Sequence, residues 1–138
     1  MIYLLDTSAL VRLLASRGLA AAWRPEIEGQ VMATCSPQRT EFLYSARGGE
    51  DFDRATEMFA ALHPDVAVPK NANRWAESVQ YRMSRNGHHR SASAVDLLIA
   101  ATAAHHGLTV LHDDGDYATI ARHAPELTEH NVHDVPLR

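Results

Sequence analysis

Short apolar runs of strand length alternate with longer segments of helical character along most of the chain, and this alternation limits the folds open to it. The apolar runs are IYLL at 2–5, VMATC at 31–35 and TVLH at 109–112. Segments whose apolar residues recur at helical spacing follow each run. Strands that alternate with helices favour a parallel sheet covered on both faces. The sequence therefore predicts an α/β protein built as a three-layer α/β/α sandwich around a central, mainly parallel sheet.

The helix boundaries are marked by residues that start and stop helices. Ser36 is expected as an N-cap with Pro37 in the first turn, and Gly48-Gly49 as the stop of that helix. Pro25 must lie in a first turn or break its helix. A last strand is expected at NVHDV (131–135). The expected helices cover 8–15, 18–29, 36–49, 51–62, 71–87, 91–107 and 116–124.

The chain has the size and composition of one ordinary globular domain. Its 138 residues are 46% hydrophobic and 22% charged, so we expect a single domain over 1–138. No apolar stretch approaches the roughly 20 residues of a membrane span, and no basic segment precedes an apolar one at the N-terminus. The single cysteine, Cys35, cannot form an internal disulfide. We expect a cytoplasmic protein that has no membrane partner.

The charge balance excludes a protein that binds nucleic acid through a general basic field. The formal net charge is −4. Local basicity remains at YRMSRNGHHR (81–90), which carries Arg82, Arg85 and Arg90 and no acid. These arginines either contact RNA phosphates near a site or form a solvated helix end, and the sequence alone leaves both open.

Acidic residues follow the predicted strands, where ligands bind in open α/β sheets. Each has a structural alternative, such as helix capping for Asp6 and a capping box with Ser93 for Asp96. However, Asp96 enters the apolar helix LLIAATAA, where a buried carboxylate is costly unless it is paired or binds a cation. Crowded carboxylates favour Mg²⁺, with Mn²⁺ as an alternative, over zinc. The acids are Asp6, Glu41, Asp96, Asp113, Asp114 and Asp116.

Two other classes of phosphate-handling protein are disfavoured. A nucleotide binder that cradles phosphates needs a glycine-rich loop after the first strand, and DTSAL contains no glycine. A phospho-accepting receiver domain needs paired acids early in the chain and a late lysine. Here Asp6 stands alone, and Lys70 is the only lysine.

Four segments, taken in order, resemble a known family. DTSAL, TEFLY, SAVDLLIAATA and LHDDGDY are similar to the four acidic motifs of PIN-domain ribonucleases, and in particular of the VapC toxins of bacterial VapBC toxin–antitoxin pairs. The resemblance covers essentially the whole chain. It implies that the metal-site carboxylates are those of Asp6, Glu41, Asp96 and Asp114, with Asp116 as a nearby fifth. Asp114 is chosen over Asp113 because it matches the first acid of the D-x-D-[FY] pattern.

The resemblance also implies an activity and partners. We expect metal-assisted hydrolysis of RNA phosphodiester bonds, with Asp6 and Asp96 holding the metal and Glu41 and Asp114 holding a second ion or orienting water. A VapB-type antitoxin and a homodimer are implied as partners. The apolar residues Leu13, Leu14 and Trp23 either line an antitoxin groove or belong to the core. The alternatives are a housekeeping RNA-processing nuclease and a non-catalytic PIN-like module that binds RNA or a partner.

Overall fold

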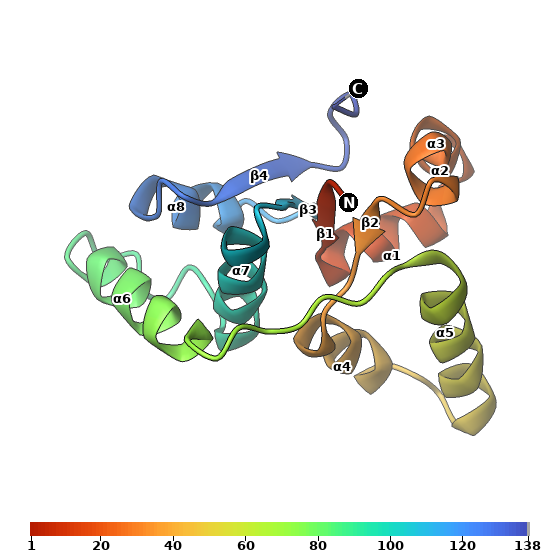
Figure 1. The fold of residues 1–138 in the computed structure, drawn as a ribbon, viewed down its shortest axis with the longest axis horizontal. Helices are drawn as coiled ribbons and strands as arrows, with labels where there is room; N and C mark the ends of the chain where they lie inside the picture. Colours follow the sequence, from red (N-terminus) through yellow and green to blue (C-terminus); the bar gives the residue numbers. More distant parts are fainter. Residues whose placement is uncertain (138) are drawn as a thin grey trace.

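The computed structural model of the protein describes residues 1–137 and is organised around a parallel four-stranded sheet (Figure 1). The strand order is β2-β1-β3-β4, and every neighbouring pair is parallel. The N-terminal strand is therefore an inner strand, hydrogen-bonded on both edges. The strands are β1 (Tyr3–Leu5), β2 (Met32–Ala33), β3 (Thr109–His112) and β4 (Thr128–Asn131).

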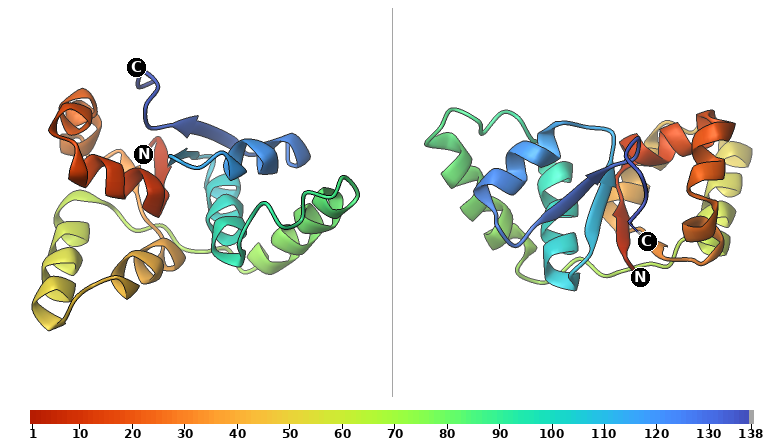
Figure 2. Two further views of the ribbon diagram at one scale, coloured as in Figure 1. Left: turned by 180° about the vertical axis from the view of Figure 1, so that it is seen from behind. Right: turned by 90° about the horizontal axis from the view of Figure 1, so that it is seen from above.

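Helices cover both faces of this sheet, so the predicted α/β/α sandwich is confirmed. In Figure 2, α6, α7 and α8 lie to one side of the strands, and α1, α2, α3 and α5 lie to the other. The helices of the described residues are α1 (Thr7–Ala15), α2 (Arg17–Ala22), α3 (Arg24–Glu28), α4 (Ser36–Tyr44), α5 (Gly49–Leu62), α6 (Ala72–Ser84), α7 (Ala94–His106) and α8 (Asp116–His123).

The side chains of β1 alternate between two apolar cores, as the pleat of a strand requires. Leu4 joins the core formed with α6, α7 and α8, whereas Tyr3 and Leu5 join the core formed with α1 and Trp23. All three are fully buried. Burial of such a side chain contributes about 1.5–3 kcal/mol, so β1 is held firmly from both faces. This fixes the position at which the strand ends, and hence the position of Asp6.

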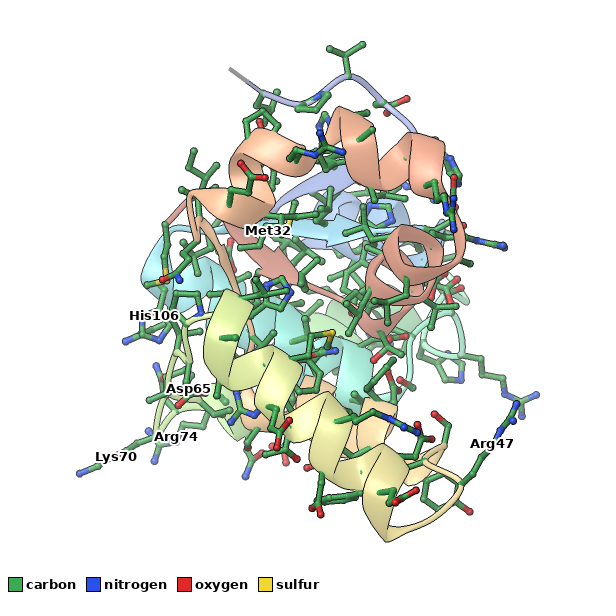
Figure 3. The ribbon with its side chains drawn as sticks, turned by 90° about the vertical axis from the view of Figure 1, so that its right-hand side faces the viewer. Met32, Arg47, Asp65, Lys70, Arg74 and His106 are labelled. Atoms are coloured by element: carbon green, nitrogen blue, oxygen red, sulfur yellow. The ribbon has the colours of Figure 1, made fainter. Side chains whose placement is uncertain are left out.

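Apolar side chains make up most of the interior, and several long charged side chains extend outward. Met32 of β2 lies in the interior, whereas Arg47, Lys70 and Arg74 extend outward (Figure 3). Helix α7 is apolar on nearly every side, as its sequence predicts, and Ile99, Ala100 and Ala103 are fully buried in it. Among residues 1–137, none of the helices has the length and apolar character needed to cross a membrane.

Three predicted boundaries are wrong. The last strand is Thr128–Asn131 and not 131–135, because β4 is a polar edge strand without the apolar signal that suggested the later segment. Ser36 is the first residue of α4, and Cys35 occupies the N-cap position. Gly48 does not stop α4, which ends at Tyr44; it precedes α5 instead.

The segment 18–29 forms two helices, α2 and α3, which meet at Trp23, with Pro25 in the first turn of α3. The two roles left open for Leu13, Leu14 and Trp23 are now divided among them. Trp23 and Leu13 are core residues, whereas Leu14 is 57% exposed. Leu14 lines a hollow of about 230 Å³ that is otherwise formed mainly by α4 and α5, with Phe42 and Met58 among the lining residues.

Candidate metal centre

The carboxyl ends of β1 and β3 and the N-terminus of α7 bring acids from separate parts of the chain together. One carboxylate oxygen from each of Asp96, Asp114 and Asp116 lies within 4.8 Å of the other two. Asp96 comes from the first turn of α7, and Asp116 is the first residue of α8. We call these three residues the acidic group. The family resemblance implies five metal ligands, and the acidic group consists of three of them.

Asp6 lies beside this group and is held by hydrogen bonds on both carboxylate oxygens. It caps α1, and its Oδ2 accepts hydrogen bonds from the Ser8 N–H at 3.0 Å and from the Ser8 hydroxyl at 2.5 Å. Its Oδ1 accepts one from the Tyr117 hydroxyl at 2.7 Å. The same hydroxyl oxygen is 3.4 Å from Asp96 Oδ1, so a single phenol lies between the two carboxylates. Capping and a place beside the acidic group are therefore compatible roles for Asp6.

Asp96 likewise combines a structural role with a place in the acidic group. It forms a capping box with Ser93: the Ser93 hydroxyl oxygen accepts from the Asp96 N–H at 3.1 Å, and Asp96 Oδ2 accepts from the Ser93 N–H at 3.2 Å. The residue is only 9% exposed. Burial raises the pKa of Asp96 to about 6, and the charges of Asp6 and Asp114 add to the rise. This carboxylate would gain from a nearby cation.

The three aspartates that follow β3 point in different directions. Asp113 turns toward α1, where its Oδ2 is 2.7 Å from Arg12 Nε and 3.3 Å from His133 Nε2. The hydrogen bond from Arg12 lowers the pKa of Asp113. Asp114 and Asp116 face Asp96 instead, and Asp114 Oδ1 accepts from the Asp116 N–H at 2.9 Å. The geometry thus places Asp113 outside the acidic group.

The residues that contact the acids from inside the protein, His112 and Tyr117, were given no role in the site by sequence reasoning. His112 is almost completely buried, and its Nδ1 accepts from the Asp114 N–H at 3.1 Å, while its Nε2 is 2.5 Å from Glu129 Oε2. The Tyr117 ring lies against His112, with ring centroids 5.1 Å apart. The only sequence signal for Tyr117 was its place in the D-x-D-[FY] pattern. Its bond to Asp6 spans 111 residues and has no local signature.

Glu41 and the three arginines lie outside the acidic group. Glu41 is exposed on α4, a helix that packs against both α1 and α7. Arg82, Arg85 and Arg90 are all exposed near the end of α6 and in the connection to α7. That connection runs along the side of the molecule toward which the strands point (Figure 2). Arg85 lies over the Tyr81 ring, 4.7 Å from its centroid.

The donor set of this centre fits a hard divalent cation. The acidic group offers only carboxylate oxygens, which Mg²⁺ and Mn²⁺ prefer. Burial, followed by the charge of Asp114, raises the pKa of Asp116 as well, so ionising the whole group without a cation is unfavourable. The N-termini of α1, α7 and α8 carry Asp6, Asp96 and Asp116 and offset only part of this charge.

Comparison with known proteins points to one family. Residues 3–123 match the PIN domain. The chain is 47% identical to Ribonuclease VapC6 of Mycobacterium tuberculosis over 103 residues, which cover 75% of this chain and 81% of the relative. It is 38% identical to Ribonuclease VapC2 of the same species over 136 residues, which cover 97% of this chain and 95% of the relative.

Solved structures share the fold at lower sequence identity. The crystal structure of VapBC2 from Rickettsia felis, bound to a DNA fragment from its promoter, gives a TM-score of 0.76 at 17% identity and covers 95% of this chain and 98% of that one. The structure of DNA-bound VapBC from Salmonella typhimurium gives 0.75 at 17% identity, with 96% and 98% covered.

Proposed function

The chain belongs to the PIN-domain family, alongside the VapC ribonucleases, and on that premise we propose that it is a Mg²⁺-dependent endoribonuclease toxin that hydrolyses RNA phosphodiester bonds. The observation that carries the proposal is the acidic group, in which oxygens of Asp96, Asp114 and Asp116 lie within 4.8 Å of one another beside Asp6. We take residues 1–138 as one catalytic domain and the cytoplasm as its compartment, where the buried free thiol of Cys35 stays reduced.

Each acid has a distinct part in this proposal. Asp6 and Asp96 would hold Mg²⁺ or Mn²⁺ most directly, while Glu41 and Asp114 hold a second ion or orient the attacking water, and Asp116 lies close by. A bound divalent ion supplies a Lewis acid that activates water and neutralises charge on the phosphate. Asp96 must lose its proton to bind a cation, and its pKa of about 6 makes that loss favourable at neutral pH.

Substrate binding must overcome the charge of the protein itself. With a formal net charge of −4, the chain repels RNA at long range. Arg82, Arg85 and Arg90 are exposed near the end of α6 and in the connection to α7, so we propose that they contact phosphates and orient the RNA without reading its bases. Arginine suits this role because its planar fork matches phosphate oxygens.

The catalytic proposal is tested by RNA cleavage with matched substitutions. Purified protein is incubated with total RNA and Mg²⁺, with and without EDTA, beside Asp96→Asn, Asp114→Asn and Asp113→Asn. We expect EDTA, Asp96→Asn and Asp114→Asn each to reduce cleavage by at least the roughly 10–100-fold that is lost when a residue orienting a metal ligand is removed. Asp113→Asn is the control because Asp113 faces Arg12 outside the acidic group, and it should cleave nearly as well as the wild type. Cleavage that persists through chelation and both substitutions contradicts the proposal.

We propose a VapB-type antitoxin as the neutralising partner and a homodimer as the assembly. Two solved structures that share this fold, those from Rickettsia felis and Salmonella typhimurium, are VapBC complexes. Leu14, Phe42 and Met58 line an apolar hollow that suits the nonpolar side of an antitoxin segment. Growth arrest on expression, relieved by co-expression of the neighbouring gene, separates a toxin from a housekeeping nuclease or a non-catalytic module.

The antitoxin surface is tested with Leu14→Asp. Because Leu14 is 57% exposed, the substitution should leave folding and RNA cleavage intact. We expect it to weaken neutralisation by the antitoxin, measured as growth during co-expression. Full neutralisation of an active Leu14→Asp variant excludes this hollow as the binding surface. Size-exclusion chromatography with light scattering tests the homodimer, and a monomeric mass contradicts it.

A further inference from the structure

A buried phenol lies between two of the carboxylates of the candidate metal centre. Tyr117 is fully buried on α8, directly after Asp116. Its hydroxyl oxygen is 2.7 Å from Asp6 Oδ1 and 3.4 Å from Asp96 Oδ1. A hydroxyl has one proton, so the short contact to Asp6 is the hydrogen bond and the long contact to Asp96 is secondary. The phenol thus connects the acid at the end of β1 with the acid at the start of α7.

Asp6 depends on this hydrogen bond for its orientation. The two cores that hold β1 fix the backbone at Asp6, but they leave the side-chain torsions free. Ser8 donates twice to Oδ2, and Tyr117 donates to Oδ1, so the carboxylate is held from both sides. Without the phenol, nothing among the hydrogen bonds described for Asp6 would hold Oδ1 toward Asp96, and the repulsion between the two carboxylates would favour their separation.

Tyr117 is itself held in place. Its ring lies against His112 with centroids 5.1 Å apart, and His112 is fixed by the Asp114 N–H on one side and Glu129 on the other. A buried aromatic ring packed in this way has a single available rotamer. The hydroxyl is therefore presented to Asp6 from a rigid support, as residues that orient metal ligands are.

We propose that Tyr117 is a positioning residue whose hydroxyl holds the Asp6 carboxylate beside Asp96 and so adds a fourth carboxylate to the acidic group. This inference rests on the proposed metal-dependent function. Phenylalanine would fill the same volume but would not orient Asp6. The contrasting view is that Tyr117 only packs the core, in which case its hydroxyl makes no difference to cation binding.

The test is the affinity for Mn²⁺ of the Tyr117→Phe protein, measured from the electron paramagnetic resonance signal of free Mn²⁺ during a titration. We expect binding about 10–100-fold weaker than in the wild type, the range seen when a residue that orients a metal ligand is removed. Tyr3→Phe is the matched control, because it also removes a buried tyrosine hydroxyl, one that accepts from the Leu137 N–H at 3.0 Å away from the acids. It should bind Mn²⁺ like the wild type.

Two further variants test whether the loss of Mn²⁺ affinity acts through Asp6 and whether Mn²⁺ binds at this centre. In an Asp6→Asn background, Tyr117→Phe should change Mn²⁺ affinity little further, because the residue through which the tyrosine acts is already altered. An undiminished loss in that background overturns the inference, as does a Tyr117→Phe protein with wild-type affinity. Asp96→Asn is the reference for the centre itself: if it leaves Mn²⁺ affinity unchanged, the metal-dependent function fails, and the inference fails with it.

The wild-type protein gives an independent readout that does not depend on the folding of any variant. Because the phenol donates to Asp6, a cation bound by that carboxylate changes the electric field at the ring. We expect Mn²⁺ to produce a tyrosine difference spectrum in the near ultraviolet. The absence of a tyrosine signal at saturating Mn²⁺ overturns the inference.

Discussion

The burial of Asp96 has a thermodynamic consequence that does not depend on catalysis: in the absence of a cation, Asp96→Asn should stabilise the protein. The rise in the pKa of Asp96 from 3.8 to about 6 corresponds to about 3 kcal/mol, since each pH unit is worth about 1.4 kcal/mol. The native state binds the proton more tightly than the unfolded state, so wild-type stability falls as the pH rises from about 4 to 6 and remains low above it. Asparagine keeps an oxygen for the capping box with Ser93 and carries no charge.

Urea unfolding in EDTA at pH 8 and pH 5 measures this effect. We expect Asp96→Asn to raise the free energy of unfolding by up to about 3 kcal/mol at pH 8 and by about half of that at pH 5. Asp113→Asn is the control of opposite sign: the pKa of Asp113 is lowered by Arg12, so its ionised form stabilises the fold and its loss should destabilise it slightly at pH 8. If Asp96→Asn is no more stable than the wild type at pH 8, the reasoning from burial and crowding is refuted.

The same urea unfolding experiment with Mg²⁺ or Mn²⁺ in place of EDTA tests whether a cation stabilises the wild type more than Asp96→Asn. A cation that binds the native state stabilises it by an amount that grows with concentration over the dissociation constant. The wild type should gain stability on addition of the metal, and Asp96→Asn should gain much less. Equal gains in the two proteins would mean that the cation binds elsewhere.

Three further predictions concern single positions. Gly107→Ala should lower the free energy of unfolding by about 1 kcal/mol in urea titrations, because Gly107 has a φ of +67°. Gly115→Ala is the control and should change this free energy little, because Gly115 has a φ of −58° and open space around it. Burial raises the pKa of the Cys35 thiol to about 11, so a thiol reagent should label it at neutral pH far more slowly in the native protein than in urea; equal rates would contradict this. Glu129→Ala should cost about 1–3 kcal/mol in urea unfolding, because it leaves the buried Nε2 of His112 without its partner, whereas Glu129→Gln should keep most of the stability.

The sequence predicts those features of the fold that leave a local pattern. The apolar run at 2–5 and the carboxylate after it predict a strand that ends at Asp6, and Gly107 predicts the end of α7. The last strand was expected at 131–135, too late in the sequence, because an edge strand needs no apolar side chains on its exposed side and the residues Thr128–Asn131 resemble a loop. Its position is set by pairing with β3, which no local pattern records.

In the candidate site, too, the sequence predicts what has a local pattern and does not predict what distant contacts determine. The resemblance names the acids and favours Asp114 over Asp113 by its pattern, but it does not show where the side chain of Asp113 points. Asp113 is turned out of the acidic group by Arg12, and the two residues are 101 positions apart in the sequence. The hydroxyl of Tyr117 is assigned to Asp6 by an equally distant contact. Orientation within the site depends on tertiary contacts, which sequence reasoning on one chain does not reach.

The inner position of β1 has a consequence for when the candidate metal centre can form during synthesis of the chain. The ribosome makes Asp6 early, but Tyr117, which donates a hydrogen bond to it, follows 111 residues later. Asp113, whose N–H donates to the Ser8 hydroxyl, follows 105 residues after Ser8. Contacts of such long range form late and slowly in folding. A nascent chain that ends before Asp96 contains none of the three residues of the acidic group, so a prematurely released fragment of that length lacks the proposed metal centre. The acidic group therefore forms only after nearly the whole chain has been made and β1 has been inserted between its neighbours.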